Sequence, residues 1–341
     1  MKKSEFTLKE IAHQAGLSLA TIDRVMNARP GVRPTTLKRV KQSLRELKNQ
    51  QDQIFMVGRK FMIDVLVEAP DRFMELLRNA LETELQAMQP AVFRCRFHMA
   101  EIIKPEKIIA QLRQIGLRGS HGVLLKAPDL PEIVEAVDAL VQKGIPVITL
   151  VTDIPHSRRL AYVGIDNRAA GQTAAYLVGS WLKSPKATIL VTLSSVGFRG
   201  EEEREMGFRK ALRQNYPHLN LVEVSEGFGK NQATGELVAD ALRQNPNICA
   251  VYSIGGANTA VIEAFASMGR QIHVFIAHDL DVDNLKLLKQ SRLNAVMHHD
   301  LRADMHTCCR LIMQANGALP NQDINPLSAI QVITPFNIPH I

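Results

Sequence analysis

Polar and aromatic side chains follow several short apolar runs of this sequence, at the points where buried strands would end. Carboxylate, amide and guanidinium groups can bond neighbouring hydroxyls, and a phenylalanine ring can cover the apolar face of a sugar. Taken alone, each such Asp has the alternative of a helix cap, and each such Arg has the alternative of a solvated surface charge. The candidates for a sugar or polyol site are Asp71 and Arg72, Asp153, Arg199 or Arg204, Asn258, Asp279, and His298 or His299, with Phe73 or Phe198 as the ring.

The charge distribution points to different chemistry in the first sixty residues. Of the chain's 41 Lys and Arg and 34 Asp and Glu, residues 1–60 hold 13 and 5, so the net charge of +7 comes from this segment. Clustered cations suit a phosphate backbone, because binding releases its condensed counterions. An anionic membrane is the competing partner, but the apolar positions here form short faces typical of a domain core. The pattern favours nucleic acid.

The cysteines and the hydropathy pattern indicate the cellular compartment of the protein. Cys95, Cys249, Cys308 and Cys309 show no Cys-x-x-Cys spacing, and no apolar signal region precedes them. No stretch reaches the roughly 18 apolar residues of a membrane span. We therefore expect a soluble, cytoplasmic protein without a membrane partner.

Enzyme and metal-binding motifs are weak in this sequence. The segment 253–261, SIGGANTAV, lacks the G-x-G-x-x-G of a dinucleotide site, and there is no P-loop lysine motif or G-x-S-x-G elbow. Residues 298–309 contain His, Asp and Cys, but His306 lies two residues from Cys308, which puts these two side chains on different helix faces. We expect a core helix there, no metal, no cofactor and no enzyme activity.

Three short helices must position the basic residues at the start. Thr7 with a glutamate three residues later is a capping box that opens the first helix, and Gly16 ends it. Ser18 begins a second helix that runs to about Asn27, and Pro34 begins a third. Two helices joined by a tight glycine turn and closed by a third make a helix-turn-helix, whose second helix reads DNA. A basic bundle used for protein contact is the alternative.

The predicted DNA contacts divide into two groups. Side chains of the second helix outside its apolar stripe would face the major groove, where Arg24 can bond a guanine and Leu19 and Ala20 can pack on thymine methyls or sugars. These groove-facing residues are Leu19, Ala20, Thr21, Asp23, Arg24 and Asn27. Residues near helix starts suit phosphates, and these are Thr7, Ser18, Arg33 and Thr36.

The segments TLKEIAHQAGLSLAT (7–21) and RVMN (24–27) closely resemble the lac repressor (LacI/GalR) family. The resemblance implies base-reading positions for Leu19, Ala20 and Arg24, and backbone-holding positions for Thr7, Ser18, Asn27 and Thr36. This sequence departs from the family at Asp23, where a Ser is common, and at Arg33, where a capping Ser is common. Operator sequence is therefore not transferable from relatives.

The linker after the head also departs from the family. Relatives carry Pro-Asn and then Ala-Arg-x-Leu in a hinge helix, whereas residues 48–62 read KNQQDQIFMVGRKFM and look about three residues short. Ile54, Phe55 or Met56 could serve as an apolar wedge in the minor groove. A plain linker whose apolar residues pack on the body is the other interpretation.

In the remaining chain, short apolar runs alternate with helical segments. This alternation is typical of parallel sheets with crossover helices, and about eight strands over this length suit two lobes. We expect an α/β, doubly wound parallel-sheet body, with ligands at the carboxyl ends of its strands. The expected division is a head at 1–49, a linker at 50–61 and a body at 62–341.

The body resembles the ribose-binding type of periplasmic binding fold, over essentially all of 61–341. The matching motifs are TDIP (152–155), YVGIDNRAAGQTAA (162–175), REMGFRKAL (204–212) and AHD (277–279). The resemblance implies one lobe of about 62–158 and 296–325 and another of about 159–295 and 326–341. It places ligand contacts at Asp71 to Phe73, Asp153, Arg204, Asn258 and Asp279, and puts His299 where a Gln is common.

Together these features predict a sequence-specific DNA-binding transcription regulator, a repressor, controlled by a small molecule between two lobes. The expected effector is a sugar, a polyol or a sugar phosphate, and the expected DNA partner is a double-stranded operator. A homodimer would place two heads on the half-sites of a pseudo-palindrome. The alternative is an intracellular sugar-binding or sugar-processing protein without operator-specific regulation.

Overall fold

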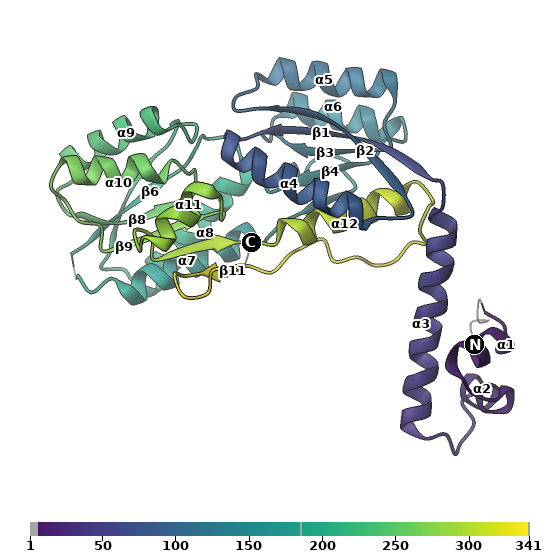
Figure 1. The fold of residues 1–341 in the computed structure, drawn as a ribbon. Helices are drawn as coiled ribbons and strands as arrows, with labels where there is room; N and C mark the ends of the chain where they lie inside the picture. The colour runs from purple at the N-terminus through teal and green to yellow at the C-terminus, as the bar shows by residue number, and fades with distance from the viewer. Residues whose placement is uncertain (1–5, 185, 340–341) are drawn as a thin grey trace.

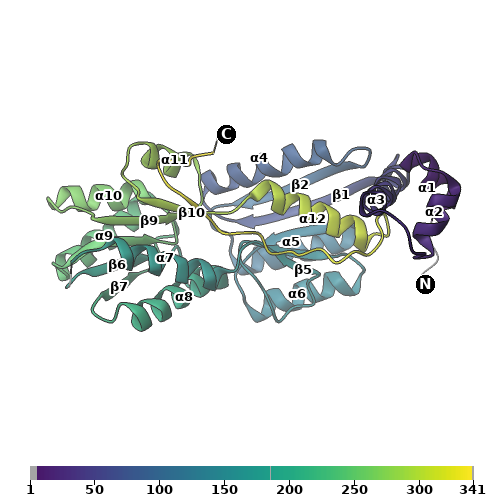
Figure 2. The same cartoon turned by 90° about the horizontal axis from the view of Figure 1, so that it is seen from below.

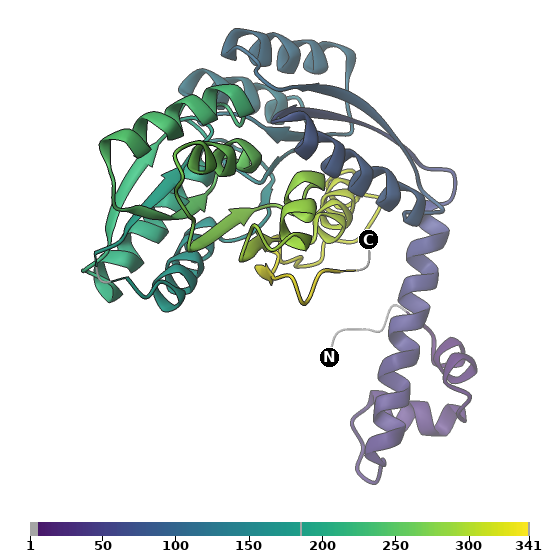
Figure 3. The same ribbon diagram turned by 60° about the vertical axis from the view of Figure 1, so that its left-hand side comes forward.

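The computed structural model describes residues 6–184 and 186–339, as a small helical head and two α/β lobes (Figure 1). The head lies at the far end of a long helix, well away from both lobes (Figures 1 and 3). Its helices are α1 (Leu8–Ala15), α2 (Leu19–Met26) and the first half of α3 (Pro34–Met56). The expected order, three helices followed by a parallel α/β body in two lobes, is confirmed.

Local capping interactions fix the helix ends of the head. Thr7 Oγ1 accepts from the Glu10 amide at 3.3 Å, and Glu10 Oε2 accepts from the Thr7 amide at 2.7 Å, so both arms of the capping box form. Gly16 adopts the left-handed conformation that ends α1. The Ser18 hydroxyl caps α2, and Pro34 is the first residue of α3. The buried core of the head is Ile11, Ala12, Ala15, Ile22 and Val40.

The linker differs from the sequence-based expectation, because α3 continues through it to Met56. Its 23 residues span about 34 Å at the usual helical rise. No Pro or Gly lies between Thr35 and Val57 to interrupt the helix, and Gly58, at φ 78°, provides the turn into the first strand. Ile54 is 72% exposed and does not pack on the body. The side chains of Phe55 and Met56 lie outside the described part.

The N-lobe contains a parallel five-stranded sheet of order β2-β1-β3-β4-β5. Helices α4 and α12 cover one face of this sheet, and α5 and α6 cover the other (Figure 2). The strands are β1 (Lys60–Glu68), β2 (Val92–Ala100), β3 (Gly122–Lys126), β4 (Val147–Leu150) and β5 (Ala161–Val163). The helices are α4 (Asp71–Ala87), α5 (Pro105–Arg118), α6 (Pro131–Gln142) and α12 (Leu301–Ala315).

The C-lobe contains a six-stranded sheet of order β11-β10-β9-β8-β6-β7, in which β11 alone is antiparallel to its neighbour. Helices α7 and α8 cover one face, and α9, α10 and α11 cover the other. The strands are β6 (Thr188–Thr192), β7 (Asn220–Val224), β8 (Ile248–Ser253), β9 (Val274–His278), β10 (Ala295–His298) and β11 (Gln331–Ile333). The helices are α7 (Asn167–Trp181), α8 (Arg199–Asn215), α9 (Asn231–Gln244), α10 (Asn258–Ser267) and α11 (Val282–Lys289).

The chain passes between the lobes later than the sequence suggests at two of its crossings. β5 pairs with β4 and so belongs to the N-lobe, and β10 pairs with β9 and so belongs to the C-lobe. The lobe boundaries expected at residues 158 and 296 therefore lie later in the chain, just after β5 and just after β10. Alternation of short apolar runs gives strand positions but not the sheet each strand joins. The described residues form eleven strands rather than about eight, and these include the half-exposed edge strand β7 and the four-residue β10.

Among the described residues, no helix combines the length and apolar character needed to cross a lipid bilayer.

Candidate functional site

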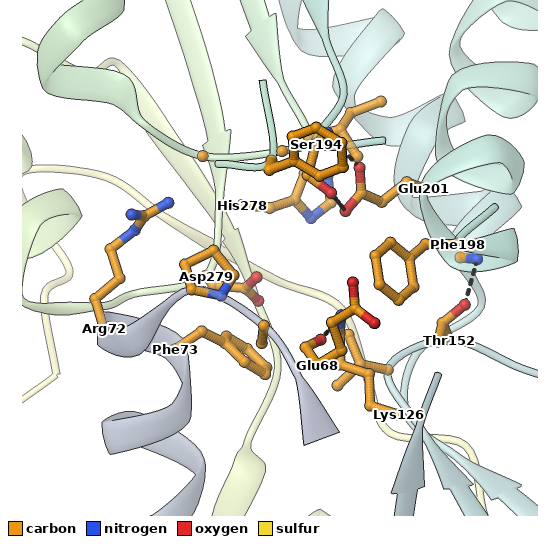
Figure 4. Close-up of a pocket in the computed structure, with 18 of the residues that line it drawn as sticks. Glu68, Arg72, Phe73, Lys126, Thr152, Ser194, Phe198, Glu201, His278 and Asp279 are labelled. Atoms are coloured by element: carbon orange, nitrogen blue, oxygen red, sulfur yellow. Dashed lines mark hydrogen bonds between the residues drawn. The ribbon is translucent and has the colours of Figure 1, made fainter. Parts of the chain in front are cut away.

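A cavity lies between the two lobes, at the carboxyl ends of their strands (Figure 4). From the N-lobe, Glu68 ends β1 and Lys126 ends β3, and both side chains line it. From the C-lobe, Ser194 follows β6, and His278 and Asp279 stand at the end of β9. This is the position at which parallel α/β sheets bind ligands, because the strand ends of both sheets meet there.

Of the eleven candidate residues named from the sequence, five line this cavity. The rings of Phe73 and Phe198 point into it from the two lobes (Figure 4). Phe73 and Phe198 were alternatives for the aromatic side chain of the site, and both line the cavity. Of the alternatives Arg199 and Arg204, it is Arg204 that lines it. Arg199 instead forms ion pairs with Asp129 and Glu203. The five lining residues are Arg72, Phe73, Phe198, Arg204 and Asp279.

The structure does not place Asp71, Asp153, Asn258 or His299 on the cavity wall. Asp71 is exposed in the first turn of α4, where its charge suits the helix N-terminus. Asp153 is engaged by Arg159.

Asn258 and His299 are buried behind the wall. The Asn258 amide donates to Asn284 Oδ1 at 2.6 Å. His299 Nδ1 lies 2.5 Å from Asp304 Oδ2, and its Nε2 lies 3.8 Å from Asp279 Oδ1. His299 Nε2 has no hydrogen-bond partner within the described chain, and His299 is buried next to Asp279 without lining the cavity. Its neighbour His298 accepts a hydrogen bond from the Leu280 amide and does not line the cavity either.

The sequence did not predict several titratable residues that line the cavity: Glu68, Glu101, Lys126, Glu201, His278 and Asp281. For two of them a signal was present, since Glu68 and Lys126 are charged residues that close an apolar run. His278 and Asp281 flank the predicted Asp279. Glu101 directly follows β2, so a strand-end signal was present there too, whereas Glu201 lies in a polar segment and carried none.

Burial shifts the protonation of the N-lobe wall. It raises the pKa of Glu68, which nearby Lys126 partly opposes, and it lowers the pKa of the buried Lys126. Lys126 Nζ donates to the main-chain oxygen of Glu68 at 2.7 Å and lies 3.9 Å from the centre of the Phe198 ring. The ammonium group is thus held by a carbonyl and an aromatic face.

On the C-lobe wall, hydrogen bonds orient the polar groups. Glu201 accepts from the Ser194 amide at 2.7 Å and from the Ser194 hydroxyl at 2.6 Å. His278 Nε2 lies 2.8 Å from the Tyr252 hydroxyl, and burial, with Arg204 adding to it, holds the pKa of His278 well below its ordinary value. His278 is therefore a neutral hydrogen-bonding group near pH 7.

Three lining residues keep a buried polar atom without a partner within the described chain. These atoms are Glu68 Oε2, Arg204 Nη2 and His278 Nδ1. Arg204, only 3% exposed, is fixed by donating from Nε to Asn167 Oδ1 at 2.8 Å. Buried polar atoms nearly always have partners, so three unsatisfied ones on one cavity mark a place where a polar ligand would supply the missing bonds.

Ion pairs join the lobes around the cavity. Lys230 of the C-lobe lies 3.2 Å from Glu101 of the N-lobe, and Arg199 lies 3.4 Å from Asp129. The amide of Gly200 also donates to Thr152 Oγ1 at 2.9 Å across the same boundary. The lobes are therefore closed over the cavity.

Comparison with known families identifies both parts of the chain. Residues 7–50 match the model described as bacterial regulatory proteins, lacI family, and residues 65–317, most of the chain, match the periplasmic binding protein domain. The chain is a lacI-family regulatory protein. The comparison with curated protein sequences gives no match. Both matched families are non-enzymatic, in agreement with the motif analysis.

Solved structures share the fold of the lacI-family body. The glucose-galactose binding protein GanP of Geobacillus stearothermophilus is 20% identical with a TM-score of 0.73, over 83% of this chain and 100% of its own. The fructose binding periplasmic domain of BT1754 is 21% identical at TM-score 0.72, over 81% and 91%. A putative LacI transcriptional regulator from Bacteroides fragilis is 14% identical at TM-score 0.70, over 82% and 98%.

The head of this lacI-family protein presents both apolar and polar side chains on the surface of α2. Leu19, Ala20, Arg24 and Asn27 are exposed there, and Thr21 is half-buried. At the helix starts, Arg33 is exposed without a capping bond and Thr36 is half-buried, while the Thr7 and Ser18 hydroxyls serve as caps.

The unusual Asp23 of α2 is neutralised by its neighbours. Asn27 Nδ2 donates to Asp23 Oδ1 at 2.7 Å, and Arg29 forms an ion pair with the same carboxylate at 3.2 Å. The negative charge that would repel phosphate is therefore compensated inside the head. Within the described residues, no group of three or more His, Cys, Asp or Glu is arranged to hold a metal ion.

Proposed function

We propose that this lacI-family protein is a transcription repressor whose operator affinity is controlled by a sugar or polyol bound between its lobes. The main observation is the set of unpartnered buried atoms of Glu68, Arg204 and His278, which offer a carboxylate acceptor, a guanidinium donor and an imidazole nitrogen to a polyhydroxylated ligand. The rings of Phe73 and Phe198 suit its apolar faces. Several structures with the same fold are described as sugar-binding proteins, one with bound D-allose.

A continuous path supports coupling between the ligand and the head. β1 begins at Lys60, two residues after the Gly58 turn that ends α3, and finishes at Glu68 in the cavity. Its nine residues span about 30 Å, and eight of them are at least half-buried between helices. A shift of Glu68 on ligand binding would move the C-terminal end of α3, the helix that carries the head. We propose that this strand replaces the family's hinge segment as the route of communication.

The proposed working unit is a cytoplasmic homodimer bound to a pseudo-palindromic operator. Two copies of the head would meet two half-sites, with Leu19, Ala20 and Arg24 of each reading bases and Thr7, Ser18, Arg33 and Thr36 holding phosphates. The effector would change the distance or freedom of the two heads by favouring one arrangement of the lobes.

The deciding experiment joins DNA binding to ligand binding. Genomic fragments retained by the purified full chain give an operator, and fluorescence anisotropy then measures affinity for it with and without single sugars and polyols. We expect at least one compound to raise the melting temperature and to change operator affinity at least tenfold. A ligand at 100 times its Kd would stabilise the fold by about 2.7 kcal/mol. Chemical conversion of the sugar, or ligand binding without any effect on a specific DNA site, would overturn the proposal.

A further inference from the structure

Asn167 joins the two lobes at the first place where the chain passes between them. It is the first residue of α7, in the C-lobe, and follows β5 of the N-lobe. Its side-chain NH2 donates to the Tyr162 hydroxyl of β5 at 2.9 Å and to the Val151 carbonyl, just after β4, at 3.2 Å. Its oxygen accepts from Arg204 Nε of α8 at 2.8 Å. One amide, 3% exposed, therefore links a cavity residue of the C-lobe to the N-lobe.

Close packing makes α7 and α8 a single rigid unit. A Cβ on Gly171 of α7 would lie 1.9 Å from the main-chain oxygen of Arg204. On the same interface, a Cβ on Gly207 of α8 would lie 2.2 Å from the main-chain oxygen of Arg168. Main chains in such contact leave no space for one helix to shift against the other. A displacement of Arg204 therefore carries Asn167 and the start of α7 with it.

The N-lobe partner of Asn167 is a strained residue of the cavity wall. Val151 lines the cavity and has φ 65°, in the left-handed region that a β-branched residue rarely adopts. Its carbonyl faces the C-lobe, where a Cβ on Gly200 would lie 2.7 Å from the oxygen. A strained conformation persists only where its surroundings hold it. The hydrogen bond from Asn167 is one of the contacts that hold Val151, so the strain depends on the C-lobe being in place.

The other end of Arg204 is available to a ligand. Its Nη2 is buried without a partner within the described chain, and the side chain lines the cavity. The guanidinium group is planar and rigid, so a bond to Nε restricts the directions in which the terminal nitrogens point. The position of Asn167 therefore sets how Arg204 meets a ligand, and the N-lobe sets the position of Asn167.

We propose that Asn167 is a positioning residue that ties effector binding to the arrangement of the lobes. Arg204 is aimed at the effector only while Asn167 keeps its bonds to Val151 and Tyr162, so the bound effector favours the lobe arrangement in which those bonds form. The inference rests on the proposed function and adds the side chain through which the occupied cavity fixes the lobes. Neither Asn167 nor Tyr162 lines the cavity, so both act through Arg204.

The first test measures sugar affinity after removal of the amide. The probes are D-glucose, D-galactose, D-ribose, D-fructose and D-allose, and the one with the largest thermal shift is titrated by calorimetry into full-length protein. We expect Asn167→Ala to raise its Kd at least tenfold. Asn231→Ala is the matched control, since Asn231 is also the first residue of a C-lobe helix but is exposed, and its Kd should stay within twofold of wild type. An equally small change in Asn167→Ala overturns the inference.

A double-mutant cycle separates positioning of Arg204 from general support of the fold. If Asn167 acts through Arg204, Asn167→Ala should weaken sugar binding less than twofold in a protein that already carries Arg204→Ala. A residue that only stabilises the fold would lower affinity by the same factor in both backgrounds. Equal factors would therefore show that Asn167 does not aim Arg204.

Tyr162→Phe tests the N-lobe half of the link and does not depend on Asn167→Ala folding. It removes the hydroxyl that accepts from Asn167 and leaves the bond between Asn167 and Arg204. Loss of one neutral hydrogen bond should raise the Kd of the sugar about fivefold. The rise should be less than twofold in the Arg204→Ala background, and Tyr176→Phe, on the exposed side of α7, should change nothing. A rise of equal size with and without Arg204 contradicts the link.

Operator affinity separates this inference from the proposed function. With saturating sugar, the operator affinity of wild type should change at least tenfold, and this change should be at least threefold smaller in Asn167→Ala. If both proteins respond by the same factor, sugar control stands and the coupling role of Asn167 is wrong. If no probe sugar binds wild type or changes its operator affinity, sugar control itself is wrong, and this inference falls with it.

Discussion

Arg72 and Asp281 form an ion pair across the cleft, with Arg72 Nε 3.0 Å from Asp281 Oδ2. Arg72 lies in α4 of the N-lobe, and Asp281 is the N-cap of α11 in the C-lobe. Both side chains line the cavity, and Asp281 is almost fully buried. The pair therefore holds the lobes together beside the ligand position, and it must separate if the lobes open.

Replacement of Arg72 should weaken effector binding. Arg72→Ala removes the cross-cleft bonds and leaves Asp281 buried without its cationic partner, which disfavours the closed form. We expect the Kd of the effector to rise at least tenfold, or about 1.4 kcal/mol, in titration calorimetry. Arg113→Ala, an exposed arginine on α5, should leave the Kd unchanged. Equal affinities for the two variants would show that the ion pair does not support the closed form.

Asp281 should make stability depend on pH. Burial raises the pKa of Asp281 from 3.8 to about 6, so the folded state favours its protonated form. The stability from this group is complete below about pH 4 and is lost as the pH rises to about 6. Asp281→Asn keeps a good N-cap residue without the ionisation. Between pH 4 and 6, wild type should lose about 2 kcal/mol relative to this variant in denaturant unfolding. A difference that is constant across this range would contradict the shifted pKa.

Two glycines in helices should respond oppositely to alanine. A Cβ on Gly171 of α7 would lie 1.9 Å from the main-chain oxygen of Arg204, so α8 would have to move. Gly171→Ala should destabilise the protein by about 1–3 kcal/mol and displace Arg204 from the cavity, which weakens effector binding. At Gly235 of α9 the nearest atom is 3.5 Å away, an ordinary contact.

Gly235→Ala should therefore stabilise the protein by about 0.5–1 kcal/mol, as alanine does in an open helical position. Thermal unfolding and calorimetry on the two variants measure both effects. A Gly171→Ala protein as stable as wild type, with unchanged ligand affinity, would mean that the close approach of α7 and α8 does not position Arg204.

Arg24 should carry sequence preference in DNA binding. Its side chain is exposed on α2, whereas the neighbouring acid Asp23 is bound by Asn27 and Arg29. Arg24→Ala should cost about 1–3 kcal/mol on the operator and little on scrambled DNA. Lys38→Ala, which removes an exposed charge of α3, should weaken both DNAs alike. Anisotropy titrations on the two DNAs measure these losses, and a footprint that survives Arg24→Ala would exclude the assigned role.

The sequence by itself determined the local features of this protein. The capping box of Thr7, the left-handed end at Gly16 and the start of α3 at Pro34 depend on bonds and backbone preferences within a few residues, so they can be read in order along the chain. The alternation of apolar runs gave the parallel α/β body for the same reason. The split of charge predicted a nucleic-acid-binding head, which the lacI-family match to residues 7–50 supports.

Only the tertiary structure decided which of the predicted residues meet. Asp153 follows a strand just as Asp279 does, yet Arg159 engages it away from the cavity. Glu68 and Lys126, 58 residues apart, become neighbours because β1 pairs with β3, and the cavity closes because Arg72 meets Asp281 from the other lobe. Strand order and lobe closure depend on the packing of the whole chain, so no spacing within one segment encodes them.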